Sequence, residues 1–173
     1  PTSDQIIIGA GSEYLMMLLT QILGTSRTIA MENPTYRQAY RVFESLGCQM
    51  KPVEMDAHGM NVRLLEESGA DIAYVMPSHQ YPMGVVMPVK RRQELLSWAG
   101  RGEKRYLIED DYDSEFRYRG KPVPALQGMD IQGKVIYMGT FSKSIAPAIR
   151  VGYLVLPAPL LAVYKRKCGF YAS

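Results

Sequence analysis

The 173-residue sequence is poor in several features, and each shortage excludes a class of protein or site. Its two cysteines, Cys48 and Cys168, are too few and too far apart for a disulfide framework or a zinc cluster. No apolar run is long enough for a transmembrane helix, and no signal peptide is recognisable. The net charge is only +3, and the basic runs at 90–93 and 165–168 are typical of solvated helix faces rather than of a nucleic-acid-binding surface. We therefore expect a cytoplasmic protein without structural disulfides or a metal site.

Short runs rich in β-branched and aromatic residues alternate with helical patterns along most of the chain. The runs predict seven strands at 5–9, 28–32, 49–55, 71–77, 105–110, 134–140 and 151–157. The helical patterns cover residues 12–23, 35–47, 60–68, 89–100 and 160–168. This alternation predicts an α/β fold of three layers, α/β/α, in which helices cover both faces of a mostly parallel seven-stranded sheet.

Two local features indicate how the outer strands lie. Pro52 falls inside the third strand, and proline is confined to edge strands because it cannot donate a ladder hydrogen bond. Residues 141–150 are too few for an ordinary parallel crossover between the last two strands, so the last strand should run antiparallel. Its first residues then lie at the edge where the other strands end.

The residues at this edge are candidates for chemistry, because ligands of open α/β sheets bind beyond the carboxyl ends of the strands. GAGS (9–12) leads from a strand directly into a helix, and this pattern suits a backbone anion site, although many such turns are glycine-rich for steric reasons alone. EDDYD (109–113) ends the fifth strand, and alternation places Asp110 and Tyr112 on one face. A metal site is the rival interpretation of these acids, but no clear set of partner ligands accompanies them.

Two further loops add candidates with weaker signals. ENPTY (32–36) is either a turn before a helix, with Tyr36 packed, or an aromatic face for a planar ligand. PSHQYPMG (77–84) contains His79 and Gln80, which either satisfy local polar groups or point into the cleft.

The sixth strand ends in GTFSK (139–143), and Arg150 follows seven positions after Lys143. Lys143 is a solvated surface charge, a phosphate contact or a reactive amine of the kind that forms Schiff bases. An anion site, an aromatic face, a carboxylate and a lysine on one rim are the groups that a phosphorylated pyridine aldehyde requires. We therefore favour the reactive amine.

The order of these motifs resembles that of one known family. The motifs are GAGSEYL (9–15), ENPTY (32–36), PSHQYPMG (77–84), EDDYDSEFRY (109–118) and GTFSKSIAPAIRVGY (139–153). The last two are the most specific, and the five motifs are spread over nearly the whole chain. The chain resembles the large domain of fold-type-I pyridoxal phosphate proteins, and most of all the aminotransferase-like domain of the MocR group of GntR-type bacterial transcriptional regulators. The resemblance implies the strand order 1-7-6-5-4-2-3 and pyridoxal 5'-phosphate as the cofactor.

The resemblance also implies a role for each candidate. Lys143 would carry the cofactor as an aldimine, Asp110 would pair with the pyridine nitrogen, Tyr112 would bond the phenolic oxygen and Tyr36 would stack on the ring. The phosphate would be held by Gly11, Ser12, Thr140, Ser142 and Arg150. Aminotransferases usually place an asparagine of an N-P-x-G motif on the phenolic oxygen; this chain has HQYPMG instead, so His79 or Gln80 would take that role.

For the whole protein, the resemblance implies a longer chain. Residues 1–173 would be the large domain, and both ends look cut. A winged-helix DNA-binding domain would precede it and a small domain would follow it. The protein would be a homodimer that responds to an amino acid or amine. Two other functions stay open: a class I or II aminotransferase acting on amino acids, and an α/β domain without a cofactor. The EDDYDSEFRY and SHQYP motifs favour the regulator.

Overall fold

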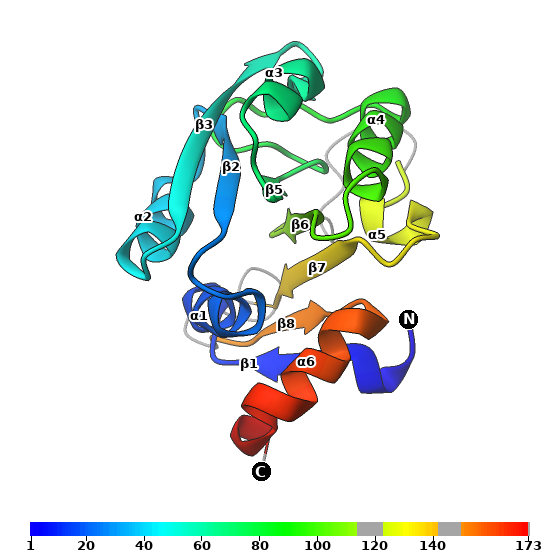
Figure 1. The fold of residues 1–173 in the computed structure, drawn as a ribbon. Helices are drawn as coiled ribbons and strands as arrows, with labels where there is room; N and C mark the ends of the chain where they lie inside the picture. Colours follow the sequence, from blue (N-terminus) through cyan, green and yellow to red (C-terminus); the bar gives the residue numbers. More distant parts are fainter. Residues whose placement is uncertain (114–122, 142–149, 173) are drawn as a thin grey trace.

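A computed structural model describes residues 1–113, 123–141 and 150–172. Its strands form one sheet in the order β1-β8-β7-β6-β5-β2-β3-β4 (Figure 1). The strands are β1 (Ile6–Gly9), β2 (Thr28–Asn33), β3 (Gln49–Asp56), β4 (Gly59–Met60), β5 (Ile72–Val75), β6 (Tyr106–Asp111), β7 (Val135–Thr140) and β8 (Gly152–Val155). The central strand β5 is buried along its whole length, which explains its continuous apolar sequence.

Helices cover both faces of this sheet. They are α1 (Ser12–Leu23), α2 (Arg37–Ser45), α3 (Val62–Glu67), α4 (Val89–Gly100), α5 (Leu126–Met129) and α6 (Ala158–Cys168), with 3-10 turns at Ser3–Gln5 and Gly169–Ala172. One core packs α1, α2 and α6 on the first face, through side chains such as Leu15, Phe43 and Leu160. A second core packs the other three helices on the opposite face, around Trp98 and Leu126. The predicted α/β/α layers are therefore confirmed.

The predicted strand directions are also confirmed. β8 pairs antiparallel with both β7 and β1, whereas β7, β6, β5, β2 and β3 pair in parallel. The start of β8 thus lies beside the end of β7, where Thr140 pairs with Gly152. This arrangement brings Arg150 to the rim where the parallel strands end.

The predicted strand count was wrong, because the described residues form eight strands rather than seven. The additional strand, β4, is a two-residue return that pairs Met55 with Met60 and Asp56 with Gly59. Gly59 adopts a φ of 100°, which makes this tight return possible. Two residues are too few to show an alternating pattern, so the sequence gives no signal for β4. It covers only the last two residues of β3, and Pro52 lies in the part of β3 that pairs with β2 alone.

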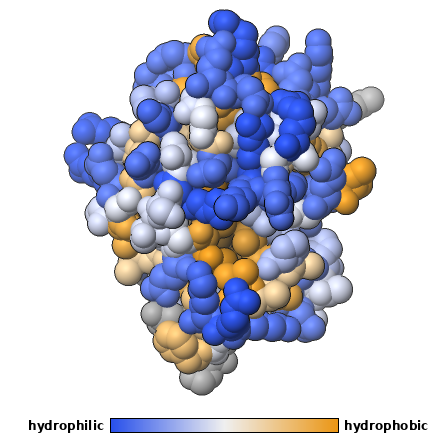
Figure 2. Space-filling model, viewed as in Figure 1, coloured by the Kyte–Doolittle hydropathy of each residue, from blue (hydrophilic) through white to orange (hydrophobic). Residues whose placement is uncertain are grey.

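The surface of the domain is mainly hydrophilic in the view of Figure 2, with apolar residues showing in a hollow between α1 and α6. Within the part of the chain that the structure describes, no helix has the length and apolar character needed to span a membrane.

Candidate functional site

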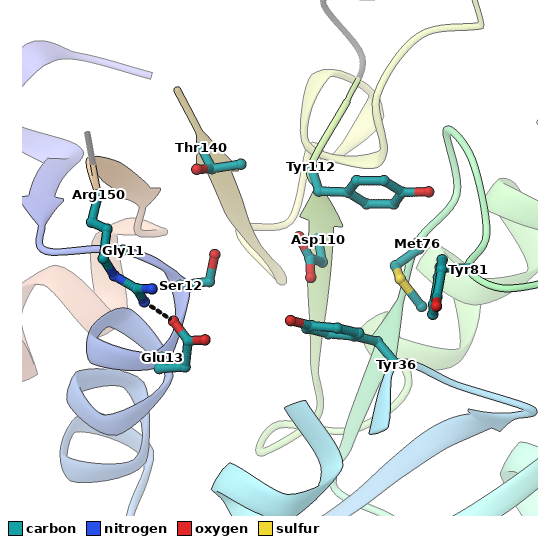
Figure 3. Close-up of a pocket in the computed structure, with 10 residues that line it drawn as sticks. All are labelled: Gly11, Ser12, Glu13, Tyr36, Met76, Tyr81, Asp110, Tyr112, Thr140 and Arg150. Carbon is teal, nitrogen blue, oxygen red and sulfur yellow. Dashed lines mark hydrogen bonds and ion pairs between the residues drawn. The ribbon is translucent and has the colours of Figure 1, made fainter. Parts of the chain in front are cut away.

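A cavity of about 470 Å³ opens at the carboxyl ends of the parallel strands. It is lined by Gly11, Ser12, Glu13, Tyr36, Met76, Tyr81, Asp110, Tyr112, Thr140 and Arg150. These residues come from the segments that follow β1, β2 and β5, from the ends of β6 and β7, and from the approach to β8. Figure 3 shows two ends: Ser12, Glu13, Thr140 and Arg150 lie on one side, and Asp110, the tyrosines and Met76 on the other.

The first end has the features of an anion site. Gly11 is the N-cap of α1, a helix of twelve residues, and no side chain caps this helix. The backbone N–H groups of its first turn are therefore available to an anion in the cavity. Gly11 has a φ of 93°, and a Cβ built on it would lie 3.1 Å from Nη2 of Arg150. The backbone conformation of residue 11 therefore favours glycine, and any larger side chain would also displace the guanidinium. Thr140 donates its hydroxyl to the carbonyl of Val151 at 3.3 Å, which ties the end of β7 to the start of β8.

Arg150 forms an ion pair with Glu13, the second residue of α1 (Figure 3). The Arg150 side chain is 61% exposed and that of Glu13 is 35% exposed, so the pair lies at the open side of the cavity. Glu13 was not among the predicted site residues. Its position in the GAGSEYL motif was the available signal. However, an acid in the first turn of a helix is common, because the helix dipole stabilises a negative charge there.

The other end is built around the buried carboxyl of Asp110. Tyr74 on the neighbouring strand β5 is fully buried and donates its hydroxyl to Oδ2 of Asp110. Burial raises the pKa of Asp110 to about 7, the Tyr74 hydrogen bond opposes this rise, and the charges of Asp111 and Asp113 add to it. The ionised form of this carboxyl is therefore stabilised most when a cationic partner enters the cavity.

The predicted alternation along β6 is confirmed by the surroundings of its acids. Asp110 and Tyr112 line the same cavity, whereas Oδ2 of Asp111 accepts a hydrogen bond of 2.6 Å from Tyr137. Asp113 is buried, and its Oδ2 lies 2.7 Å from Nδ1 of His79. The three aspartates of EDDYD therefore serve different partners, and the described residues contain no cluster of acids, histidines and cysteines suited to a metal ion.

Aromatic rings form the walls around Asp110. Tyr36 and Tyr81 meet edge to face with their centroids 6.0 Å apart, and Tyr112 lies on the other side of Asp110 in Figure 3. Burial, followed by the negative charges of Glu13 and Asp110, raises the pKa of Tyr36, so its hydroxyl stays protonated and remains a donor. Tyr81 and Met76 were not among the predicted site residues, although Tyr81 lies within the PSHQYPMG motif and Met76 directly precedes it.

His79 and Gln80 contact the walls of the cavity. Nδ1 of His79 lies 3.4 Å from the Tyr112 hydroxyl, and the two rings stack with centroids 6.2 Å apart. Gln80 is buried; it donates to the carbonyl of Pro34 at 2.9 Å and accepts from the amide of Met83 at 3.0 Å. The bond to Pro34 ties the loop after β5 to the loop after β2, so Gln80 holds the segment that carries Tyr36.

Ser142 and Lys143 lie outside the described residues. Thr140 and Arg150, which flank them in the sequence, both line the cavity. The structure thus brings together seven of the predicted site residues: Gly11, Ser12, Tyr36, Asp110, Tyr112, Thr140 and Arg150.

Comparisons with known proteins agree with this geometry. The family model for aminotransferase class I and II matches residues 2–173. The chain is 44% identical to the uncharacterized HTH-type transcriptional regulator YdeL of Bacillus subtilis over 91% of its length, and 37% identical to the probable rhizopine catabolism regulatory protein MocR of Rhizobium meliloti over 98%. It covers 34% and 35% of these two relatives, so the chain spans about a third of their length.

Among solved structures, kynurenine aminotransferase of Pyrococcus horikoshii, in complex with PMP, superposes with a TM-score of 0.84 at 32% identity, over 95% of this chain and 43% of the enzyme. The family match extends over nearly every residue and agrees with the strand order, the antiparallel β8 and the motifs that line the cavity. The chain belongs to the aminotransferase class I and II family.

Proposed function

We propose that residues 1–173 form the large, pyridoxal 5'-phosphate-binding domain of a bacterial transcriptional regulator of the MocR type. One observation carries the cofactor assignment. A single cavity of about 470 Å³ presents an anion site at one end and a buried carboxyl between tyrosine rings at the other. This separation suits a planar ring that carries a phosphate on one side and a basic nitrogen on the other.

The side chains of the cavity fit this cofactor by their chemistry. The phosphate would be held at the start of α1, by Gly11 and Ser12, and by Thr140 and Arg150, and the family resemblance adds Ser142. Asp110 would pair with the pyridine nitrogen, because a buried carboxyl needs a cation to ionise.

Tyr36 and Tyr112 would contact the ring and its phenolic oxygen. His79 would support Tyr112 through the contact between their side chains, and Gln80 would hold the loop that carries Tyr36. When bound, the cofactor supplies an aldehyde that captures primary amines and a ring that withdraws electrons. Lys143 is the amine that we propose for its attachment.

Both curated relatives are regulators by name, and the chain covers only a third of them. We therefore propose that the whole protein binds DNA through an N-terminal winged-helix domain and acts as a homodimer in the cytoplasm. An amino acid or another amine that reacts at the same cavity would be its effector.

The second candidate is a class I or II aminotransferase that acts on amino acids. The similarity to the Pyrococcus horikoshii enzyme favours it, because the same cavity and lysine would serve transamination. Among the described residues that line the cavity, Arg150 is the one cation, and we assign it to the phosphate. Binding the carboxylate of an amino-acid substrate would then require a residue elsewhere in the protein.

Stopped-flow mixing of the cofactor-loaded, full-length protein with a panel of amino acids and amines separates the two candidates. A regulator is expected to bind the cofactor and to show at most slow conversion to its amine form. Turnover at rates of on the order of 1 per second or more, typical of enzymes, would instead assign an aminotransferase. Absence of any cofactor absorbance would overturn both.

A further inference from the structure

We infer that Glu13 limits the affinity of this cavity for the phosphate group of its ligand and so keeps the cofactor exchangeable. The inference rests on the proposed function, because it concerns the same cavity. It adds that an internal carboxylate competes with the phosphate for the arginine of the anion site.

The competition follows from where Glu13 lies. It is the second residue of α1, next to Ser12, in the turn whose N–H groups attract an anion. Its carboxylate pairs with Nη2 of Arg150, the same atom that approaches Gly11 most closely. Glu13 therefore occupies the Arg150 nitrogen that a phosphate bound at the N-terminus of α1 would use.

The charges of the cavity make this competition matter. Of the described residues that line it, Arg150 is the one cation, and Glu13 and Asp110 are the acids. Asp110 lies at the ring end, so Arg150 and Glu13 cancel each other at the phosphate end (Figure 3). A phosphate that carries close to two negative charges thus meets little net positive charge from the described side chains.

The exposure of the pair sets the size of the effect. Ion pairs of this exposure contribute little free energy of stabilisation, because water screens them. A phosphate can therefore displace Glu13 from Arg150. The carboxylate nevertheless remains attached to the first turn of α1, close to the displaced position, and repels the bound phosphate. The result is a cofactor that binds but also leaves, which suits a protein that senses cofactor or effector supply.

The test compares Glu13→Gln with Glu67→Gln in the full-length protein. Glu67 is an exposed acid of α3, which lies on the far side of the molecule from α1 in Figure 1, so its substitution changes the net charge equally without touching the site. Equilibrium titrations with pyridoxal phosphate and with pyridoxal, which lacks the phosphate, give the dissociation constants. We expect Glu13→Gln to bind pyridoxal phosphate about three- to tenfold more tightly at low salt.

Three outcomes are informative. The gain should shrink at high salt and should be absent with pyridoxal and in Glu67→Gln. Unchanged or weaker binding of pyridoxal phosphate by Glu13→Gln would overturn the inference, since Glu13 would then merely orient Arg150. Failure of the wild-type protein and of Glu13→Gln to bind pyridoxal phosphate at all would instead overturn the proposed function.

Discussion

Tyr74 and Asp110 form a hydrogen-bonded pair across the neighbouring strands β5 and β6, with the tyrosine hydroxyl donating to the carboxylate. Both side chains are buried, and Asp110 lines the cavity while Tyr74 lies behind it. The hydroxyl favours the charged form of Asp110, and burial favours the neutral form. These opposing effects leave the pKa of Asp110 at about 7, so a cation that binds beside it would favour its ionised form.

Replacing Asp110 is expected to weaken cofactor binding without unfolding the protein. Asp110→Asn keeps the shape of the side chain but removes the charge that pairs with the pyridine nitrogen. A hydrogen bond to a charged group contributes about 1.5–3 kcal/mol, so the dissociation constant should rise about tenfold or more. Asp111→Asn is the matched control, because Asp111 bonds Tyr137 outside the cavity. Equal losses from both substitutions, measured by absorbance titration, would contradict the assignment of Asp110.

The cofactor-free protein should lose stability as the pH rises. Glu32, Glu109 and Asp110 are buried, and burial raises the pKa of each to about 7 from ordinary values of 4.5, 4.5 and 3.8. The folded state therefore holds these protons more tightly than the unfolded state. The stabilisation that these protonated carboxyls provide is complete below about pH 4 and is lost as the pH rises from about 4 to 7. Above that range, the three groups cause no further change in the free energy of unfolding.

Urea unfolding of the cofactor-free protein between pH 4 and 8 measures this loss. Asp110→Asn should make the decline shallower and should raise the stability of the cofactor-free protein at pH 8 by on the order of 1–3 kcal/mol. The same substitution thus weakens binding and strengthens the fold. A pH dependence as steep as that of the wild type would show that Asp110 does not titrate in this window.

Removing the Tyr74 hydroxyl should shift the pH dependence of cofactor binding. Without the donor, the pKa of Asp110 rises further, so Tyr74→Phe should weaken binding at pH 7 by about three- to tenfold and recover much of it at higher pH. Tyr137→Phe removes an equivalent bond from Asp111 and serves as the control. A loss that is the same at every pH would indicate that Tyr74 only packs the strand.

Two glycines with the same backbone torsion test the anion site. Gly11 and Gly24 both have a φ of 93°, but a Cβ on Gly24 would meet nothing within 4 Å, whereas one on Gly11 would crowd Arg150. Both alanine substitutions should cost about 1–3 kcal/mol of stability through backbone strain. Only Gly11→Ala should also weaken cofactor binding, by about tenfold. Comparable binding losses in both variants would indicate a general effect of the strain.

Much of this architecture was predictable because local patterns carry it. The short connection between residues 140 and 150 predicts an antiparallel last strand, and that direction alone places Arg150 on the correct rim. The alternation of side chains in EDDYD likewise predicts which acid faces the ligand. These predictions depend only on strand geometry, which is the same in every sheet.

The features that were missed depend on contacts between distant segments. Tyr74 lies in a continuous apolar strand, where a tyrosine gives no sign that its hydroxyl meets Asp110, 36 residues later. The Glu13–Arg150 pair joins residues 137 positions apart, and only the fold brings them together. Gln80 is comparable, since its role depends on the loop that contains Pro34.

The central claim is that pyridoxal 5'-phosphate occupies this cavity and is attached to Lys143. Borohydride reduction of the cofactor-loaded protein, followed by peptide mapping, tests it most directly, because reduction fixes the cofactor on the lysine that carries it. We predict a phosphopyridoxyl label within residues 142–150 that is absent from Lys143→Ala. A label mainly on Lys90, Lys165 or another lysine, with Lys143 unmodified, would contradict the attachment and the function built on it.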